Sequence, residues 1–252
     1  MTAPSPDSLP PAPPRRWPSK LRGWIRRGAV AACFVVGGAP WPHVAVPLAL
    51  VAAGGLLHFS AKGYLVRRAR VAREGPYRWV RHPFYLANLL LETGLLLFSG
   101  AWFVVPAYIA AALFAYRATI REEEADLAAV HGEAWREYAD RVPALVPFRG
   151  PCPPGDGPGF SILNLLYERE IPRLMRLLSL PLGLAWWHAF LDQPGPLRGH
   201  DLLPAPADAS ATVNMNALLL IGFLGVQIAS WFLAAWIRAP RLDGRPRFPE
   251  RK

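Results

Sequence analysis

The sequence predicts an all-α protein, a multi-pass transmembrane helical bundle of about six spans. Apolar residues make up 52% of the 252-residue chain and charged residues only 18%, with ten tryptophans. The apolar residues gather in four blocks, at residues 28–59, 84–116, 177–191 and 215–237. The last block can cross a hydrocarbon core of about 30 Å once, whereas the first two each suit two short crossings.

The distribution of basic residues predicts the topology. A net charge of +10 would suggest nucleic-acid binding in a soluble protein, but the positions of the 28 Lys and Arg residues argue against a nucleic-acid partner. Six precede residue 28, seven lie within residues 62–81, eight within residues 117–176, and six follow residue 237. With a short hairpin turning at Pro40 and Pro42, six spans place these segments on one face, which the positive-inside rule makes cytoplasmic.

Both termini are therefore expected in the cytoplasm, with residues 192–214 as the largest external loop. Arg outnumbers Lys, and Ala, Pro and Gly are abundant, which is typical of a GC-rich bacterial genome. The expected location is thus a bacterial cytoplasmic membrane. Cys33 is expected in a span and Cys152 in a cytoplasmic loop, so no disulfide framework is implied.

Four regions are expected along the chain. Residues 1–27, rich in Pro, Ser and Ala at their start, form a disordered basic tail. Residues 28–149 form a core with four spans. Residues 150–176 form a linker and an amphipathic interfacial helix, because Pro and Gly dominate residues 150–159. Residues 177–252 add a transmembrane hairpin and a basic tail.

Local signals divide the core further. Pro83 suits the first turn of a helix, where its missing N–H costs nothing. The fourth span continues without a Gly or Pro through the acidic run that ends at Glu124, and Gly132 is a plausible helix end. A short second helix is expected over residues 133–142.

Two cytoplasmic segments carry the candidate chemistry. The segment at residues 75–85 gathers Tyr77, Arg81, His82 and Tyr85, and the other segment places adjacent carboxylates at the exit of a span. Basic and acidic groups that face each other across an interfacial pocket suit a zwitterion such as S-adenosylmethionine. In the alternative interpretation, the basic and aromatic residues are interfacial anchors and the carboxylates a solvated helix face.

An ordered set of motifs favours the first interpretation. The chain resembles the isoprenylcysteine carboxyl methyltransferase and phospholipid methyltransferase superfamily of membrane enzymes over roughly residues 44–147. The family's Arg-His-Pro-x-Tyr motif is preceded by Gly-Pro-Tyr and followed by a Glu-Glu-x-x-Leu motif and a pattern of Gly, aromatic, Tyr and Val-Pro. The matching residues here are Gly75, Pro76, Tyr77, Arg81, His82, Pro83, Tyr85, Glu123, Glu124, Leu127, Gly132, Trp135, Tyr138, Val142, Pro143 and Pro147.

Three positions depart from the family's pattern. Ala87 stands where a Gly is frequent, His131 where an aromatic residue is common, and Trp135 where a Tyr is usual. These departures affect the expected substrate class more than the expected cofactor.

Glu92 falls inside the third predicted span, where a charge is costly. Tyr85, Asn88 and Glu92 share one helix face. This stripe either lines a cofactor or acceptor cavity, or Glu92 is a protonated carboxyl bonded to a neighbouring helix. His58, one turn before Lys62, is expected to be an interfacial residue rather than a ligand.

The resemblance implies methyl transfer from S-adenosylmethionine to a lipophilic acceptor that enters from the bilayer. The acceptor group is open between a carboxylate, an amine and a thiol. No residue pattern indicates a metal site. The candidate catalytic residues are Arg81, His82 and Glu92, and the candidate cofactor-binding residues are Tyr77, Arg81, His82, Tyr85, Glu123, Glu124 and Tyr138.

Two other classes of function compete with this hypothesis. A sterol-type membrane reductase would share a related bundle and an Arg-His-Pro motif, but it would bind NADPH through additional cationic groups. A six-span transporter or scaffold would be expected to show broken helices near the bilayer centre. The Glu123 and Glu124 pair favours the methyltransferase.

Overall fold

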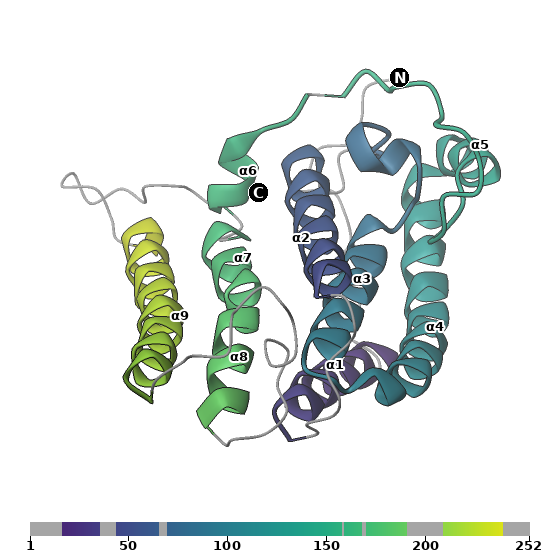
Figure 1. The fold of residues 1–252 in the computed structure, drawn as a ribbon. Helices are drawn as coiled ribbons and strands as arrows, with labels where there is room; N and C mark the ends of the chain where they lie inside the picture. The colour runs from purple at the N-terminus through teal and green to yellow at the C-terminus, as the bar shows by residue number, and fades with distance from the viewer. Residues whose placement is uncertain are drawn as a thin grey trace.

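The computed structural model describes residues 17–35, 44–65, 70–157, 159–167, 170–190 and 209–238. These segments contain helices and loops and no strand, so the all-helical fold class is confirmed (Figure 1). The elements in chain order are α1 (Trp17–Val35), α2 (Ala45–Tyr64), η2 (Gly75–Arg78), α3 (Pro83–Phe98), η3 (Trp102–Val104), α4 (Val105–His131), α5 (Glu133–Arg141), α6 (Ile162–Tyr167), α7 (Glu170–Leu178), α8 (Leu180–Phe190) and α9 (Ala209–Arg238).

The multi-pass membrane architecture is carried by long apolar helices. Three segments are long and apolar enough to cross a bilayer, Ala45–Tyr64, Trp102–His131 and Ala217–Arg238, and Pro83–Phe98 is a shorter apolar helix. The count of six spans stays a prediction. The predicted turn at Pro40 and Pro42 lies outside the described residues, as do residues 192–208 of the predicted external loop, whereas residues 209–214 belong to α9.

The expected disordered tail needs correction, because residues 17–27 are the first part of α1. Arg22 and Arg26 of these turns contact carboxylates of the bundle, and Ala29 and Cys33 further along the helix are buried in its core. Composition revealed the charge of this segment but not the carboxylates that neutralise it.

Helices α2, α3 and α4 run side by side, and α1 crosses them obliquely (Figure 1). Helix α2 approaches α3 so closely that a Cβ added at Gly54 would lie 2.7 Å from the carbonyl oxygen of Ala87. Such small residues allow helix backbones to pack tightly in a membrane. This contact fixes the position of α3, which begins at Pro83 as predicted.

Helix α4 extends past its apolar part and carries the acidic motif to the end of the bundle where α5 lies (Figure 1). It ends at His131, and Gly132 follows with φ +54°, a conformation that favours glycine. The predicted helix end at Gly132 and the predicted short helix after it, α5, are both confirmed.

The C-terminal part packs beside α2. Helices α7 and α8 form one column, and α9 lies next to them on the outside of the bundle (Figure 1). Within residues 150–176, where one interfacial helix is predicted, the structure has two helices, α6 and α7, and both pack against α2. Bulky apolar residues of α9, including Trp231 and Phe232, are exposed, as expected of a helix that faces lipid.

Candidate active site

The two halves of the predicted motif meet in one polar cluster. The Nε and Nη2 atoms of Arg81 lie 2.9 and 2.8 Å from Oε1 of Glu124, and Nε2 of His82 lies 3.0 Å from the same oxygen. The Tyr85 hydroxyl donates to Oε1 of Glu123 at 2.7 Å. The structure therefore brings together five of the predicted site residues, and the basic and acidic groups contact each other directly.

The loop after α5 holds the basic side of this cluster in place. The backbone N–H of Arg81 donates to the carbonyl of Pro143 at 2.9 Å, and the N–H of the next residue donates to Ala144 at 3.0 Å. The Nη1 atom of Arg81 also donates to the carbonyls of Ala139 and Val142, at 2.6 and 2.5 Å. A ligand carboxylate that binds this guanidinium must therefore exchange with the Glu124 pair.

Tyr77 and Tyr138 form a buried support beneath the cluster. The Tyr138 hydroxyl donates to the carbonyl of Tyr77 at 2.7 Å, while the buried Tyr77 hydroxyl has no hydrogen-bond partner among the described residues. The backbone N–H of Cys152 donates to the carbonyl of Arg78 at 3.0 Å, and this hydrogen bond ties the linker to η2. Burial raises the pKa of Tyr77, Tyr138 and Cys152.

A residue that sequence analysis missed, Arg22 of α1, also reaches the cluster. Its Nη1 atom donates to the Tyr85 hydroxyl and lies 3.8 Å from Oε1 of Glu123. Its guanidinium carbon stands 5.2 Å from the centre of the Tyr85 ring. The spacing of Arg22 and Arg26 places them on one face of a helix, but it does not indicate which residues that face contacts.

Glu92 belongs to a second polar group, deeper in the bundle. The carboxylate is only 4% exposed and accepts hydrogen bonds from Nε of Arg26 and from the hydroxyl of Tyr108. Its partner on α1 is thus a guanidinium, which neither sequence-based interpretation included. On the same face of α3, the buried Asn88 has a side-chain oxygen with no hydrogen-bond partner among the described residues.

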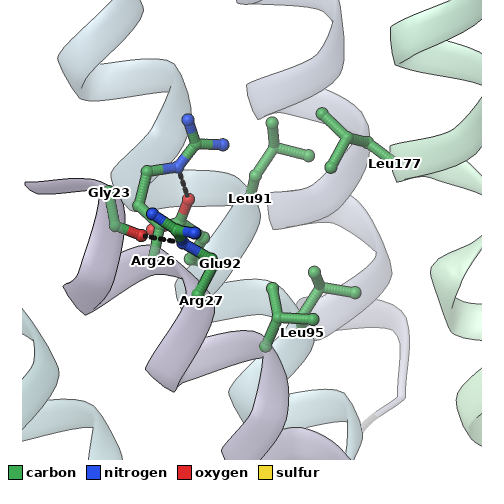
Figure 2. Close-up of a pocket in the computed structure, with 8 residues that line it drawn as sticks. Gly23, Arg26, Arg27, Leu91, Glu92, Leu95 and Leu177 are labelled. Atoms are coloured by element: carbon green, nitrogen blue, oxygen red, sulfur yellow. Dashed lines mark hydrogen bonds and ion pairs between the residues drawn. The ribbon is translucent and has the colours of Figure 1, made fainter.

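A cavity of about 290 Å³ opens beside this second group, between α1, α3 and α7. In Figure 2 the Arg26–Glu92 pair forms one wall, and leucines from α3 and α7 lie across from it. The cavity therefore combines an apolar interior with one charged wall. Its lining consists of Gly23, Arg26, Arg27, Val30, Leu91, Glu92, Leu95 and Leu177.

His58, predicted to be an interfacial residue, is buried in a pair with Glu170. Its Nδ1 atom lies 2.8 Å from Oε1 of Glu170, and the two side chains are 3% and 2% exposed. Helix α7 covers this part of α2, which the sequence alone could not indicate. The pair joins the core to the C-terminal helices.

Comparison with known proteins agrees with the motif. Residues 44–129 match the isoprenylcysteine carboxyl methyltransferase (ICMT) family. The family resemblance predicted from the sequence is confirmed. Over 100 residues the chain is also 35% identical to a protein named methanethiol S-methyltransferase from Crocosphaera subtropica.

The similarity to these proteins is partial. The alignment with the Crocosphaera protein covers 37% of this chain and 35% of that protein, so the chain spans about a third of its relative's length. No solved structure gives a significant match. The ICMT-like segment contains α2, α3 and nearly all of α4, with Arg81 to Glu124 of the polar cluster, whereas Arg22, Arg26 and Tyr138 lie outside it.

Proposed function

We propose that the protein is a membrane methyltransferase that uses S-adenosylmethionine to methylate an acceptor that partitions into the bilayer. The observation that carries this proposal is the polar cluster, in which the two ICMT-like motifs from α3 and α4 meet around Arg81 and Glu124. The cluster lies at the end of the bundle that the positive-inside rule assigns to the cytoplasm, where the cofactor is available.

The residues present suit the proposed cofactor. Arg81 and His82 offer donors for its carboxylate, and Glu123 and Glu124 offer acceptors for its ribose hydroxyls or amine. The buried hydroxyl of Tyr77, which has no hydrogen-bond partner among the described residues, is a further polar atom that a ligand can satisfy. Tyr85 and Tyr138 support the cluster through their hydrogen bonds to Glu123 and to the carbonyl of Tyr77.

S-adenosylmethionine supplies an activated methyl group, because breaking the methyl–sulfur bond of a sulfonium releases a neutral thioether, which is a good leaving group. The protein's part is to hold donor and acceptor in line and to exclude water. A carboxylate acceptor needs no base, whereas an amine or a thiol has to lose a proton. His82, whose Nε2 contacts Glu124, and Glu92 are the candidate bases.

The cavity between α1, α3 and α7 is the proposed acceptor site. Its volume of about 290 Å³ lies at the lower end of the range for small-ligand sites. Leu91, Leu95 and Leu177 suit an apolar acceptor, and the Arg26–Glu92 pair suits its polar group. A small thiol, the acceptor class in the name of the Crocosphaera protein, is one candidate.

Calorimetry on the purified protein tests the cofactor. We expect binding of S-adenosylmethionine and none of NADPH, since the cluster balances basic groups with carboxylates. A preference for NADPH would move the protein to the reductase class, and binding of neither ligand would favour a transporter or scaffold. The acceptor can then be sought by lipid and metabolite profiling of deletion cells fed methyl-labelled methionine.

A further inference from the structure

Arg22 lies outside the ICMT-like segment, yet it contacts two residues of that segment's motifs. It donates to the Tyr85 hydroxyl and approaches Glu123 to 3.8 Å. Arg26, four residues later on the same helix, pairs with Glu92 on α3. Helix α1 is thus held against the site by two arginines, of which only Arg22 touches the proposed cofactor cluster.

Arg22 also changes the charge of this cluster. Two arginines, Arg22 and Arg81, face two carboxylates, Glu123 and Glu124. With Arg22 the charges of these four side chains cancel, and without it they leave one net negative charge. The charge of Arg22 acts on a ligand in the cluster through Coulomb interaction. Solvent reduces this interaction, because Glu123 is 46% exposed.

The donor and the product of methyl transfer differ by one charge. S-adenosylmethionine carries a sulfonium, an ammonium and a carboxylate, and so has one net positive charge at neutral pH. S-adenosylhomocysteine has lost the sulfonium charge and is neutral. A negative cluster would attract the donor more than the product, and a neutral cluster removes that difference without favouring the product.

We propose that Arg22 is a positioning residue that sets the preference of the site between donor and product. It orients Tyr85 and Glu123 through direct contacts, and it neutralises one carboxylate. The inference rests on the proposed function, because it takes S-adenosylmethionine as the ligand of the cluster. In this proposal α1, which lies outside the ICMT-like segment, contributes a residue to the cofactor site.

The experiment measures the dissociation constants of both ligands and takes their ratio, product over donor. Arg22→Gln should raise this ratio roughly fivefold, because it leaves the cluster with a net negative charge. Arg22→Lys keeps the charge but loses the planar guanidinium. It should therefore weaken the binding of both ligands by the same factor and leave the ratio unchanged. The shift for Arg22→Gln should shrink as salt is added.

Glu123→Gln provides the opposite change. It leaves the cluster with a net positive charge and should lower the ratio, and the double variant Arg22→Gln/Glu123→Gln should return it to the wild-type value. Arg136→Gln is the matched control, since Arg136 pairs with Glu133 on the exposed face of α5. It removes one positive charge from the protein and should leave the ratio unchanged.

A structural role for Arg22 would weaken both ligands equally and leave the ratio where it was. An unchanged ratio in Arg22→Gln, or a double variant that keeps the ratio of Glu123→Gln, overturns the inference while donor binding still supports the proposed function. Wild-type protein that binds neither ligand overturns both. If Arg22→Gln does not fold, the double variant compared with Glu123→Gln gives the same test, because the two differ only at Arg22.

Discussion

Two carboxylates of this bundle pair with arginines in opposite surroundings. Glu124 stands where α4 leaves the apolar bundle, is 24% exposed and pairs with Arg81. Glu92 stands in the middle of α3, is almost fully buried and pairs with Arg26. Solvent reaches the Glu124 carboxylate, whereas the Glu92 carboxylate is enclosed by packed helices on all but the cavity side, although the side chain of its partner Arg26 is 26% exposed.

This difference separates exchangeable pairs from fixed ones. A partly exposed ion pair has a small net stability, so a ligand can replace one of its partners at little cost. A buried pair is costly to break, because the remaining charge stays without compensation. We therefore expect changes at Arg81 and Glu124 to appear in ligand binding, and changes at Arg26 to appear first in folding.

The largest effect is expected from breaking the buried pair. Arg26→Leu should lower the free energy of unfolding by about 3 kcal/mol, because among the described residues Glu92 then keeps only the Tyr108 hydroxyl as a hydrogen-bond partner. Unfolding in detergent micelles with increasing denaturant measures this change. The double variant Arg26→Leu/Glu92→Leu should recover most of the loss, since it leaves no unpaired charge.

The double variant also tests the catalytic assignment of Glu92. If it folds and still transfers methyl groups at the wild-type rate, Glu92 has a structural role only. A loss below about 1 kcal/mol for Arg26→Leu alone would contradict the comparison, because the two pairs would then behave alike.

The next effect concerns ligand binding at the exposed pair. Arg81→Lys should weaken the binding of S-adenosylmethionine by roughly 1.5 to 3 kcal/mol, which is the scale of a hydrogen bond to a charged group. Lysine keeps the charge but cannot contact Glu124 and the carbonyls of Ala139 and Val142 together. Calorimetry measures the affinity, and unchanged affinity in a folded variant would reduce Arg81 to a membrane anchor.

A smaller effect is expected on the acidic side. Glu124→Gln should weaken cofactor binding by about 1 kcal/mol, because the variant loses the charge that orients Arg81 and His82. Glu123→Gln tests the neighbouring carboxylate in the same way. Glu122→Gln, outside the motif, is the control and should be nearly silent. If Glu123→Gln and Glu124→Gln both bind as wild type does, the proposed site is wrong.

The sequence predicted the parts of the fold that depend on local pattern. Apolar length indicated the helices, Pro83 the start of α3, and Gly132 the end of α4. The motif also predicted that Arg81, His82, Tyr85, Glu123 and Glu124 would lie together, which the structure shows. These predictions succeeded because each signal lies within one segment or in one ordered motif.

The contacts between distant segments could not be predicted in the same way. Arg22 and Arg26 looked like part of a basic tail, because nothing near them in sequence offers a carboxylate. His58 pairs with Glu170, more than a hundred residues later, and the sequence does not indicate which face of α7 packs on α2. Charge pairing across helices depends on their packing angle and depth, which periodicity does not encode.

The third pair, Glu170 with His58, tests the comparison through its pH dependence. Burial alone would raise the pKa of Glu170, but the hydrogen bond and charge of His58, with Arg173 nearby, outweigh it and lower the pKa. A lowered pKa in the folded state means that the carboxylate stabilises the fold above its unfolded pKa and loses this contribution as pH falls. Glu170→Gln should therefore lower the free energy of unfolding by about 1 kcal/mol at pH 7, and its difference from wild type should shrink as pH drops through the range in which carboxyl groups titrate.

Unfolding curves of both proteins at several pH values measure this difference. The control is Glu137→Gln, which removes an exposed partner of Arg141 and should change the free energy of unfolding little at any pH. A wild-type advantage that stays constant down to acidic pH would show that Glu170 stabilises the contact between α2 and α7 by its shape rather than by its charge.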